Sequence, residues 1–157
     1  MDRDVIARKL EQLRHHAARI ESKKPFRAED LAANEDLRDV VVFNLVQAVE
    51  VCVDVGMHVV SESSLPPPES MGEVFDRLSD LSVFSSQHEG TELARRLKQA
   101  VGFRNVAVHG YATLDLAAVS RACEAGLEDL RRFAAAIAIK YLKPEGEAPP
   151  GSNSNPH

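Results

Sequence analysis

The sequence predicts an all-α protein, an antiparallel four-helix bundle with one additional short helix. Apolar residues recur with a helical period through four long segments. Ala, Leu, Val, Glu and Arg dominate, tryptophan is absent and aromatic residues make up 5%, a composition typical of helices that pack through aliphatic side chains. The 157 residues suffice for one hydrophobic core. We place the domain at residues 1–143 and expect a disordered tail at 144–157, which is rich in Pro, Gly, Ser and Asn.

The first two long helices are expected at residues 2–22 and at about 29–62. Asp2 or Asp4 can cap the first, and Pro25 ends it. In the second, the valines of 49–55 alternate with other residues as in a strand. The polar positions of the longer window nevertheless fall within about 120° of a helical wheel, which favours a helix. These positions are Asn44, Gln47, Glu50, Asp54, His58 and Ser61.

The remaining elements follow a rigid Leu-Pro-Pro-Pro connector at 65–68. A capping-box spacing at Ser70 opens a short helix that reaches about Leu81, and a second such spacing starts the third long helix, about 87–109. Gly110 stands where that helix should stop. Thr113 or Asp115 can cap the last helix, about 114–142, and Pro144 ends it.

Charge and cysteine content limit the classes of function. The formal net charge of −5 argues against nucleic-acid binding by the whole surface. Arg95, Arg96 and Lys98 nevertheless cluster just before Arg104, and we predict that these three bind substrate; a solvated helix face is the alternative. Cys52 and Cys123 lie on apolar helical faces, which favours small reduced core residues.

The N-terminus is charged and amphipathic, unlike a signal peptide. No apolar run reaches the roughly 18 residues of a membrane span. We therefore expect a cytoplasmic protein without membrane partners.

Arg104 falls in the middle of the apolar arc of the third long helix. A guanidinium is costly to bury unpaired, so it either pairs with Asp54 or Glu50 inside the bundle or faces a cleft or subunit interface. His109 lies about 140° round the helix from Arg104. The two can meet only if the backbone turns at Gly110 or a second chain supplies one of them.

Arg104, Asn105, His109 and Tyr111 together suit metal-independent RNA cleavage. An imidazole can exchange a proton with the 2′-hydroxyl or the leaving 5′-oxygen, and a guanidinium can stabilise the charged phosphorane. Asn105, four residues before His109, can orient the imidazole. We expect no metal and no cofactor: Asp54 and His58 have ligand spacing, but nothing nearby in the sequence completes a set.

The spacing R-x-x-x-x-H-x-Y at 104–111 resembles the signature of the HEPN superfamily, and more narrowly that of the HepT toxins of type VII HEPN/MNT toxin–antitoxin systems. The resemblance spans residues 1–142 and implies a HEPN-like fold. It also implies a homodimer with the motif in a cleft between protomers, where Arg104 and His109 cleave cellular RNA by attack of the 2′-hydroxyl. A cognate MNT nucleotidyltransferase would neutralise the toxin by adenylylating Tyr111.

Two other classes of function stay open from the residues alone. A non-catalytic HEPN subunit would dock a nucleotidyltransferase or bind nucleotide, but a docking surface does not require Arg, His and Tyr together. A purely structural helical oligomer would not explain why the chain bears the free-energy cost of placing the Arg104 cation on an apolar face.

Overall fold

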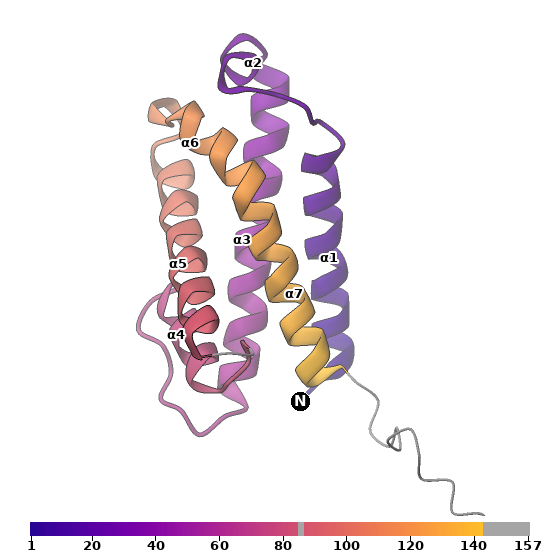
Figure 1. Cartoon of the computed structure of the whole chain (residues 1–157), viewed down its shortest axis with the longest axis vertical. Helices are drawn as coiled ribbons and strands as arrows, with labels where there is room; N and C mark the ends of the chain where they lie inside the picture. The colour runs from indigo at the N-terminus through magenta and orange to yellow at the C-terminus, as the bar shows by residue number, and fades with distance from the viewer. Residues whose placement is uncertain (85–86, 143–157) are drawn as a thin grey trace, which may run out of the picture.

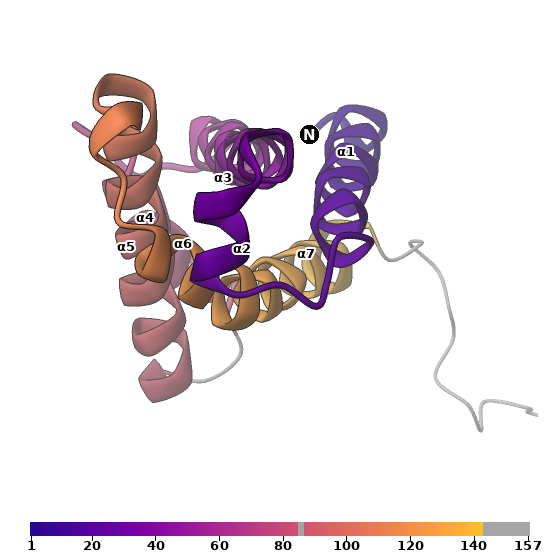
Figure 2. The ribbon, with the colours of Figure 1, turned by 90° about the horizontal axis from the view of Figure 1, so that it is seen from above.

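The computed structural model describes residues 1–84 and 87–142. Four long helices run alternately up and down, as Figure 1 shows, and α3 lies between α1 and α5 when viewed along the bundle (Figure 2). This confirms the predicted all-α four-helix architecture. The long helices are α1 (Arg3–Glu21), α3 (Glu35–Ser61), α5 (Gln87–His109) and α7 (Leu127–Tyr141).

Shorter helices cap the bundle and link its long members. The predicted helix at 29–62 is divided at Asn34, whose backbone is extended and whose side chain accepts a hydrogen bond from the Leu37 amide at 3.1 Å. That geometry is an N-cap, so the chain restarts a helix there. The described part of the chain therefore contains a short helix, α2, that the sequence did not predict. The short elements are α2 (Ala28–Ala33), α4 (Glu73–Asp80), α6 (Leu116–Arg121) and a 3-10 turn, Tyr111–Thr113.

The last predicted helix is interrupted by a wide π-type turn, Ala122–Gly126, between α6 and α7. Asp115 caps α6, because its carboxylate accepts from the amides of Ala117 and Ala118 at 3.0 and 3.3 Å. α7 ends at Tyr141. The predicted disordered tail, 144–157, lies outside the described residues.

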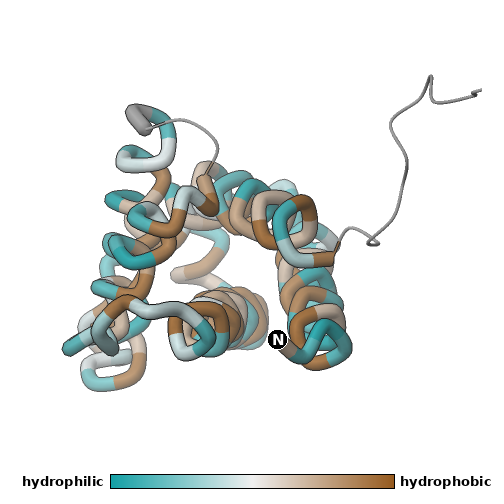
Figure 3. Tube along the Cα trace, turned by 90° about the horizontal axis from the view of Figure 1, so that it is seen from below, coloured by the Kyte–Doolittle hydropathy of each residue, from teal (hydrophilic) through white to brown (hydrophobic). Residues whose placement is uncertain are grey.

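Buried apolar residues from all four long helices form one core cluster. Figure 3 shows how hydrophobic (brown) and hydrophilic (teal) residues alternate along the trace of the helices. Phe75 and Phe133 meet edge to face, with ring centroids 6.0 Å apart. Cys52 and Cys123 are fully buried and unpaired, as predicted for small core residues. Burial raises the pKa of both thiols, that of Cys123 to about 12.

α3 is the most apolar helix of the bundle core. No uninterrupted apolar run in it reaches the roughly 18 residues of a span, yet an 18-residue window reaches a mean hydropathy of 1.8, enough by length and composition for a membrane span. However, 61% of that window is buried within the bundle. Core helices of bundles show the same composition, and here the apolar side chains of α3 pack against the other helices.

Candidate functional site

The Arg-His-Tyr motif lies at the end of α5 and in the turn that follows it. α5 continues unbroken through His109, and the Gly110 amide still bonds to the carbonyl of Val106 at 2.7 Å. Because the helix does not turn before His109, Arg104 and His109 keep their separation of about 140° round the helix axis. A bend at Gly110 therefore does not bring the two side chains together, and His109 is exposed.

Arg104 faces α3 and pairs with Glu50. Its Nε and Nη2 both donate to Oε1 of Glu50, at 3.0 and 2.8 Å. Of the two alternatives, the ion pair within the bundle is therefore formed, with Glu50 as the partner, whereas Asp54 lies 3.5 Å from the ammonium of Lys9. The Arg104 side chain is still 20% exposed and that of Glu50 32%. The pair is therefore open to solvent along the seam between α3 and α5.

Asn105 contacts the arginine of the motif. Its side-chain oxygen accepts from Nη1 of Arg104 at 3.0 Å. We expected this amide to orient His109; the structure shows it holding the guanidinium, as does Glu50.

Tyr111 begins the 3-10 turn and is 39% exposed. Its hydroxyl donates to Oδ1 of Asp39, on α3. Burial and the bond to Asp39 raise the pKa of Tyr111, while Arg38 lowers it. Tyr111 is in turn the main cause of a raised pKa at Arg38.

Sequence reasoning did not identify Asp39 and Arg38 as part of the site. A signal was present, because Asp39 lies eleven residues before Glu50 and thus about 20° from it on a helical wheel. The face of α3 that carries Glu50 therefore also carries Asp39.

An apolar hollow of about 370 Å³ lies between α3 and α5, beside Tyr111. We call it the α3–α5 hollow. Phe43 of α3 and Val108 of α5 are its most exposed apolar side chains. The hollow is lined by Asp39, Val42, Phe43, Val46, Ala107, Val108 and Tyr111.

The basic residues before the motif point in different directions. Arg96 lies 3.0 Å from a carboxylate oxygen of Asp129 on α7, and Lys98 lies 2.9 Å from Asp76 on α4. Arg95 stays at the surface, paired with Glu92 of its own helix. The cluster is therefore not a single groove, and each of its cations is engaged by an acid.

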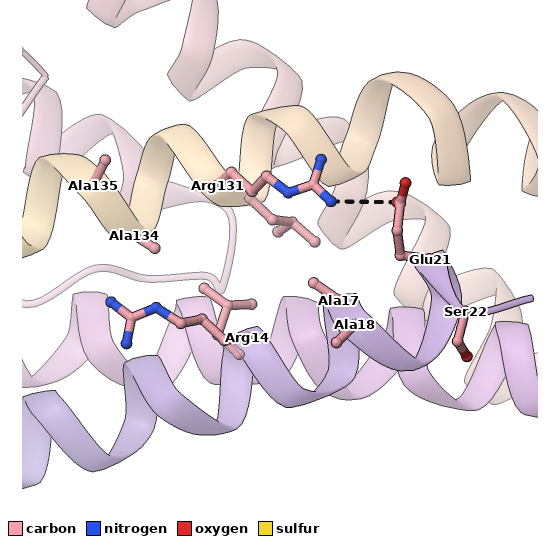
Figure 4. A pocket seen from close by; sticks show the side chains of 10 residues that line it. Arg14, Ala17, Ala18, Glu21, Ser22, Arg131, Ala134 and Ala135 are labelled. Atoms are coloured by element: carbon pink, nitrogen blue, oxygen red, sulfur yellow. Dashed lines mark hydrogen bonds and ion pairs between the residues drawn. The ribbon is translucent and has the colours of Figure 1, made fainter. Parts of the chain in front are cut away.

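A second hollow, of about 680 Å³, lies between α1 and α7 (Figure 4). Alanines form much of its lining, and an ion pair between Arg131 and Glu21, 3.3 Å long, crosses one end. None of its lining residues belongs to the motif. Within the described chain, no group of three or more His, Cys, Asp or Glu side chains is placed to hold a metal ion. The α3–α5 seam is therefore the candidate site.

Comparison with known proteins identifies the class. Residues 6–137 match the HepT-like family, described as Ribonuclease HepT-like. Because this match covers most of the chain, the protein belongs to that family. The resemblance inferred from the motif is thereby confirmed.

Individual relatives point in the same direction. The mRNA nuclease HepT of Shewanella oneidensis strain MR-1 is 33% identical over 97 residues, which cover 62% of this chain and 69% of that protein. The structure of a tri-AMPylated Shewanella oneidensis HEPN toxin in complex with MNT antitoxin has a TM-score of 0.78 at 28% identity, covering 89% of this chain and 100% of that one. A toxin–antitoxin structure with AMP-PNP has a TM-score of 0.76 at 28% identity, covering 87% and 99%.

Proposed function

We propose that this protein is the toxin of a type VII HEPN/MNT toxin–antitoxin system, a cytoplasmic endoribonuclease that needs no metal. The observation that carries the proposal is the Arg104–His109–Tyr111 motif at the open end of α5, in a chain of the Ribonuclease HepT-like family. A cognate MNT nucleotidyltransferase would neutralise the toxin by adenylylating Tyr111.

In this mechanism His109 transfers the proton and Arg104 stabilises the negative charge that develops on the phosphate. His109, exposed at the helix end, takes the proton of the 2′-hydroxyl or gives one to the leaving 5′-oxygen. Arg104 stabilises the extra negative charge of the phosphorane. The products are a 2′,3′-cyclic phosphate and a 5′-hydroxyl, and DNA, which lacks the 2′-hydroxyl, is not cut.

The geometry of one chain favours a site shared by two. Arg104 and His109 point to different sides of α5, so a second copy must bring its own His109 to the Arg104 of the first. Phe43 and Val108 offer exposed apolar surface beside the motif for such a contact. A two-fold axis there would build two equal sites, since symmetric dimers use the same surface twice.

Binding of RNA then requires an exchange of partners. Each proposed substrate-binding side chain, Arg95, Arg96 and Lys98, now faces an acid, and an RNA phosphate would replace that acid. Arg95 is the most exposed of the three, so replacing its acidic partner by a phosphate should cost the least free energy. An AMP group on Tyr111 would extend from the rim of the α3–α5 hollow and compete with the RNA phosphate through its bulk and negative charge.

The test is cleavage of a labelled RNA by the purified full chain in EDTA. His109→Ala and Arg104→Ala should each lower the rate by about 10²-fold or more, with helicity and dimer mass unchanged. His15→Ala, at an exposed histidine of α1, is the matched control and should cleave normally. Cleavage retained by His109→Ala, or lost in EDTA, would refute the proposal. A wild-type chain that binds a nucleotidyltransferase without cutting RNA would indicate the non-catalytic alternative.

A further inference from the structure

The proposed RNA cleavage uses neither Asp39 nor Arg38, yet both act on the phenol of Tyr111. The Tyr111 hydroxyl donates to Oδ1 of Asp39, which lies 72 residues earlier in the chain. Arg38, the neighbour of Asp39 on α3, lowers the pKa of the same phenol, against the effects of burial and Asp39. A carboxylate and a guanidinium thus lie beside one phenol.

This phenol is a weak nucleophile as it stands. Its pKa is raised, first by burial and then by the hydrogen bond to Asp39, so it remains protonated at neutral pH. A protonated hydroxyl attacks phosphorus readily only when a neighbouring base removes its proton. Asp39 is the carboxylate that already accepts this proton's hydrogen bond.

We propose that Asp39 is the general base, and Arg38 the anion-binding residue, for nucleotidyl transfer to Tyr111. The modified chain thereby supplies its own catalytic groups to the enzyme that modifies it. This inference rests on the proposed function, in which Tyr111 is the acceptor and a nucleoside triphosphate is the donor.

The Tyr111 oxygen forms a bond to the α-phosphorus of ATP, the bond from that phosphorus to the bridging oxygen breaks, and pyrophosphate leaves with the bonding electrons. The phenol proton passes to the carboxylate of Asp39, which returns it to solvent. The new phosphodiester carries one negative charge on its non-bridging oxygens, and Arg38 would offset this charge from beside the Tyr111 side chain.

The surroundings of the phenol suit a nucleotide. Asp39 and Tyr111 both line the α3–α5 hollow, whose other lining side chains are apolar. A purine base can pack against such a surface while its phosphate stays near the guanidinium. The fit is to the AMP moiety that remains after the transfer.

The experiment follows label from α-³²P-ATP on the full-length chain in the presence of its cognate MNT nucleotidyltransferase, with the site located by mass spectrometry. Asp39→Asn should slow labelling of Tyr111 by about 10²-fold. Asp36→Asn, at an exposed acid one turn earlier on α3, is the matched control and should be labelled at the wild-type rate. Asp39→Glu retains a carboxylate and should transfer faster than Asp39→Asn.

A pH series separates a base from a residue that only positions the phenol. The charged groups that act on this phenol are Asp39 and Arg38 of α3; Glu35 acts on Arg38, and the titratable His109 lies two residues before the phenol in sequence. Without a base the phenol must ionise by itself, so the rate of Asp39→Asn relative to wild type should rise about tenfold per pH unit below the pKa of the phenol. A purely positioning role gives a constant ratio.

A failure of the Asp39 assignment and a failure of the Tyr111 acceptor give different results. Equal labelling of wild type and Asp39→Asn, or a ratio that does not change with pH, overturns the assignment of Asp39. Absence of label from Tyr111 in the wild type overturns the proposed acceptor itself, whatever Asp39 does.

Discussion

The guanidinium of Arg104 donates two hydrogen bonds to a single oxygen of Glu50, across the seam between α3 and α5. This contact holds the cation in one orientation before any substrate arrives. It also means that an RNA phosphate must replace a carboxylate. Glu50 thus positions Arg104 and also competes with the RNA phosphate for its guanidinium.

Replacing Glu50 by glutamine should strengthen RNA binding. Glu50→Gln keeps the size and one hydrogen-bond acceptor but removes the charge that competes with phosphate. A partly exposed ion pair contributes on the order of 1 kcal/mol, so we expect KM for RNA to fall about fivefold. Steady-state cleavage kinetics measure this. Asp54→Asn is the control, because Asp54 lies four residues further along α3 and pairs with Lys9 instead of Arg104. An unchanged or higher KM in Glu50→Gln would contradict the competition between Glu50 and the RNA phosphate.

Mixing two inactive variants should restore cleavage. If each site takes Arg104 from one protomer and His109 from the other, a heterodimer of Arg104→Ala and His109→Ala contains one intact site. Random reassociation would then recover about a quarter of the wild-type activity, because half the dimers carry one of two sites. The assay is RNA cleavage after the two proteins are unfolded and refolded together. A mixture as inactive as its components would place both residues in a site of one chain.

The exposed apolar side chains beside the motif should hold the dimer together. Phe43→Asp places a charge in the proposed interface and should give monomers that no longer cleave RNA. Ile139→Asp is a closely matched control, because Ile139 on α7 is 59% exposed, as is Phe43. Light scattering after gel filtration measures the mass. A monomeric Ile139→Asp and a dimeric Phe43→Asp would assign the interface to the opposite face.

Two glycine substitutions should change stability in opposite directions. A Cβ at Gly56 would collide with Cγ1 of Val74, where α3 packs against α4. Gly56→Ala should therefore cost about 1–3 kcal/mol. Gly102, in the middle of α5, has nothing within 4 Å of the added carbon, so Gly102→Ala should gain about 0.5–1 kcal/mol. Urea unfolding measures both, and equal effects would contradict the close approach of α3 and α4.

The carboxyl of Asp129 should make stability depend on pH. Burial raises the pKa of Asp129, against the opposing effect of Arg96. A raised folded-state pKa means that its stabilising contribution is present below the unfolded pKa and is lost as pH rises through the folded value. Asp129→Asn lacks this loss, so its stability relative to wild type should be higher at about pH 7 than at about pH 3. Urea titrations at the two pH values test the direction; a relative stability that falls with pH would contradict it.

Local patterns in the sequence were enough to predict the long helices. The third, expected at about 87–109, is found at Gln87–His109, because its apolar period and Gly110 both mark its extent. The break at Asn34 was missed, since six residues are too few to display a period. The π-type turn between α6 and α7 was also missed, because it leaves the apolar stripe of the last helix intact and so gives no signal in the sequence.

The motif was predictable because its members lie within eight residues of one another. Its surroundings were not, because Asp39 and Glu50 reach it only through the packing of α3 on α5, a contact between residues more than fifty positions apart. Adjacency in the sequence was also misleading for Arg96 and Lys98. Two residues apart on a helix, they point about 160° apart, and the structure pairs them with α7 and α4.

The two sealed cysteines make this protein convenient for site-directed spectroscopy. Cys52 and Cys123 are the chain's only thiols and have no accessible surface. A maleimide dye should therefore not react with the folded protein. A single engineered surface cysteine would then carry the fluorophore alone. The rate of slow labelling of these two cysteines in the native protein would in turn measure how often the bundle opens.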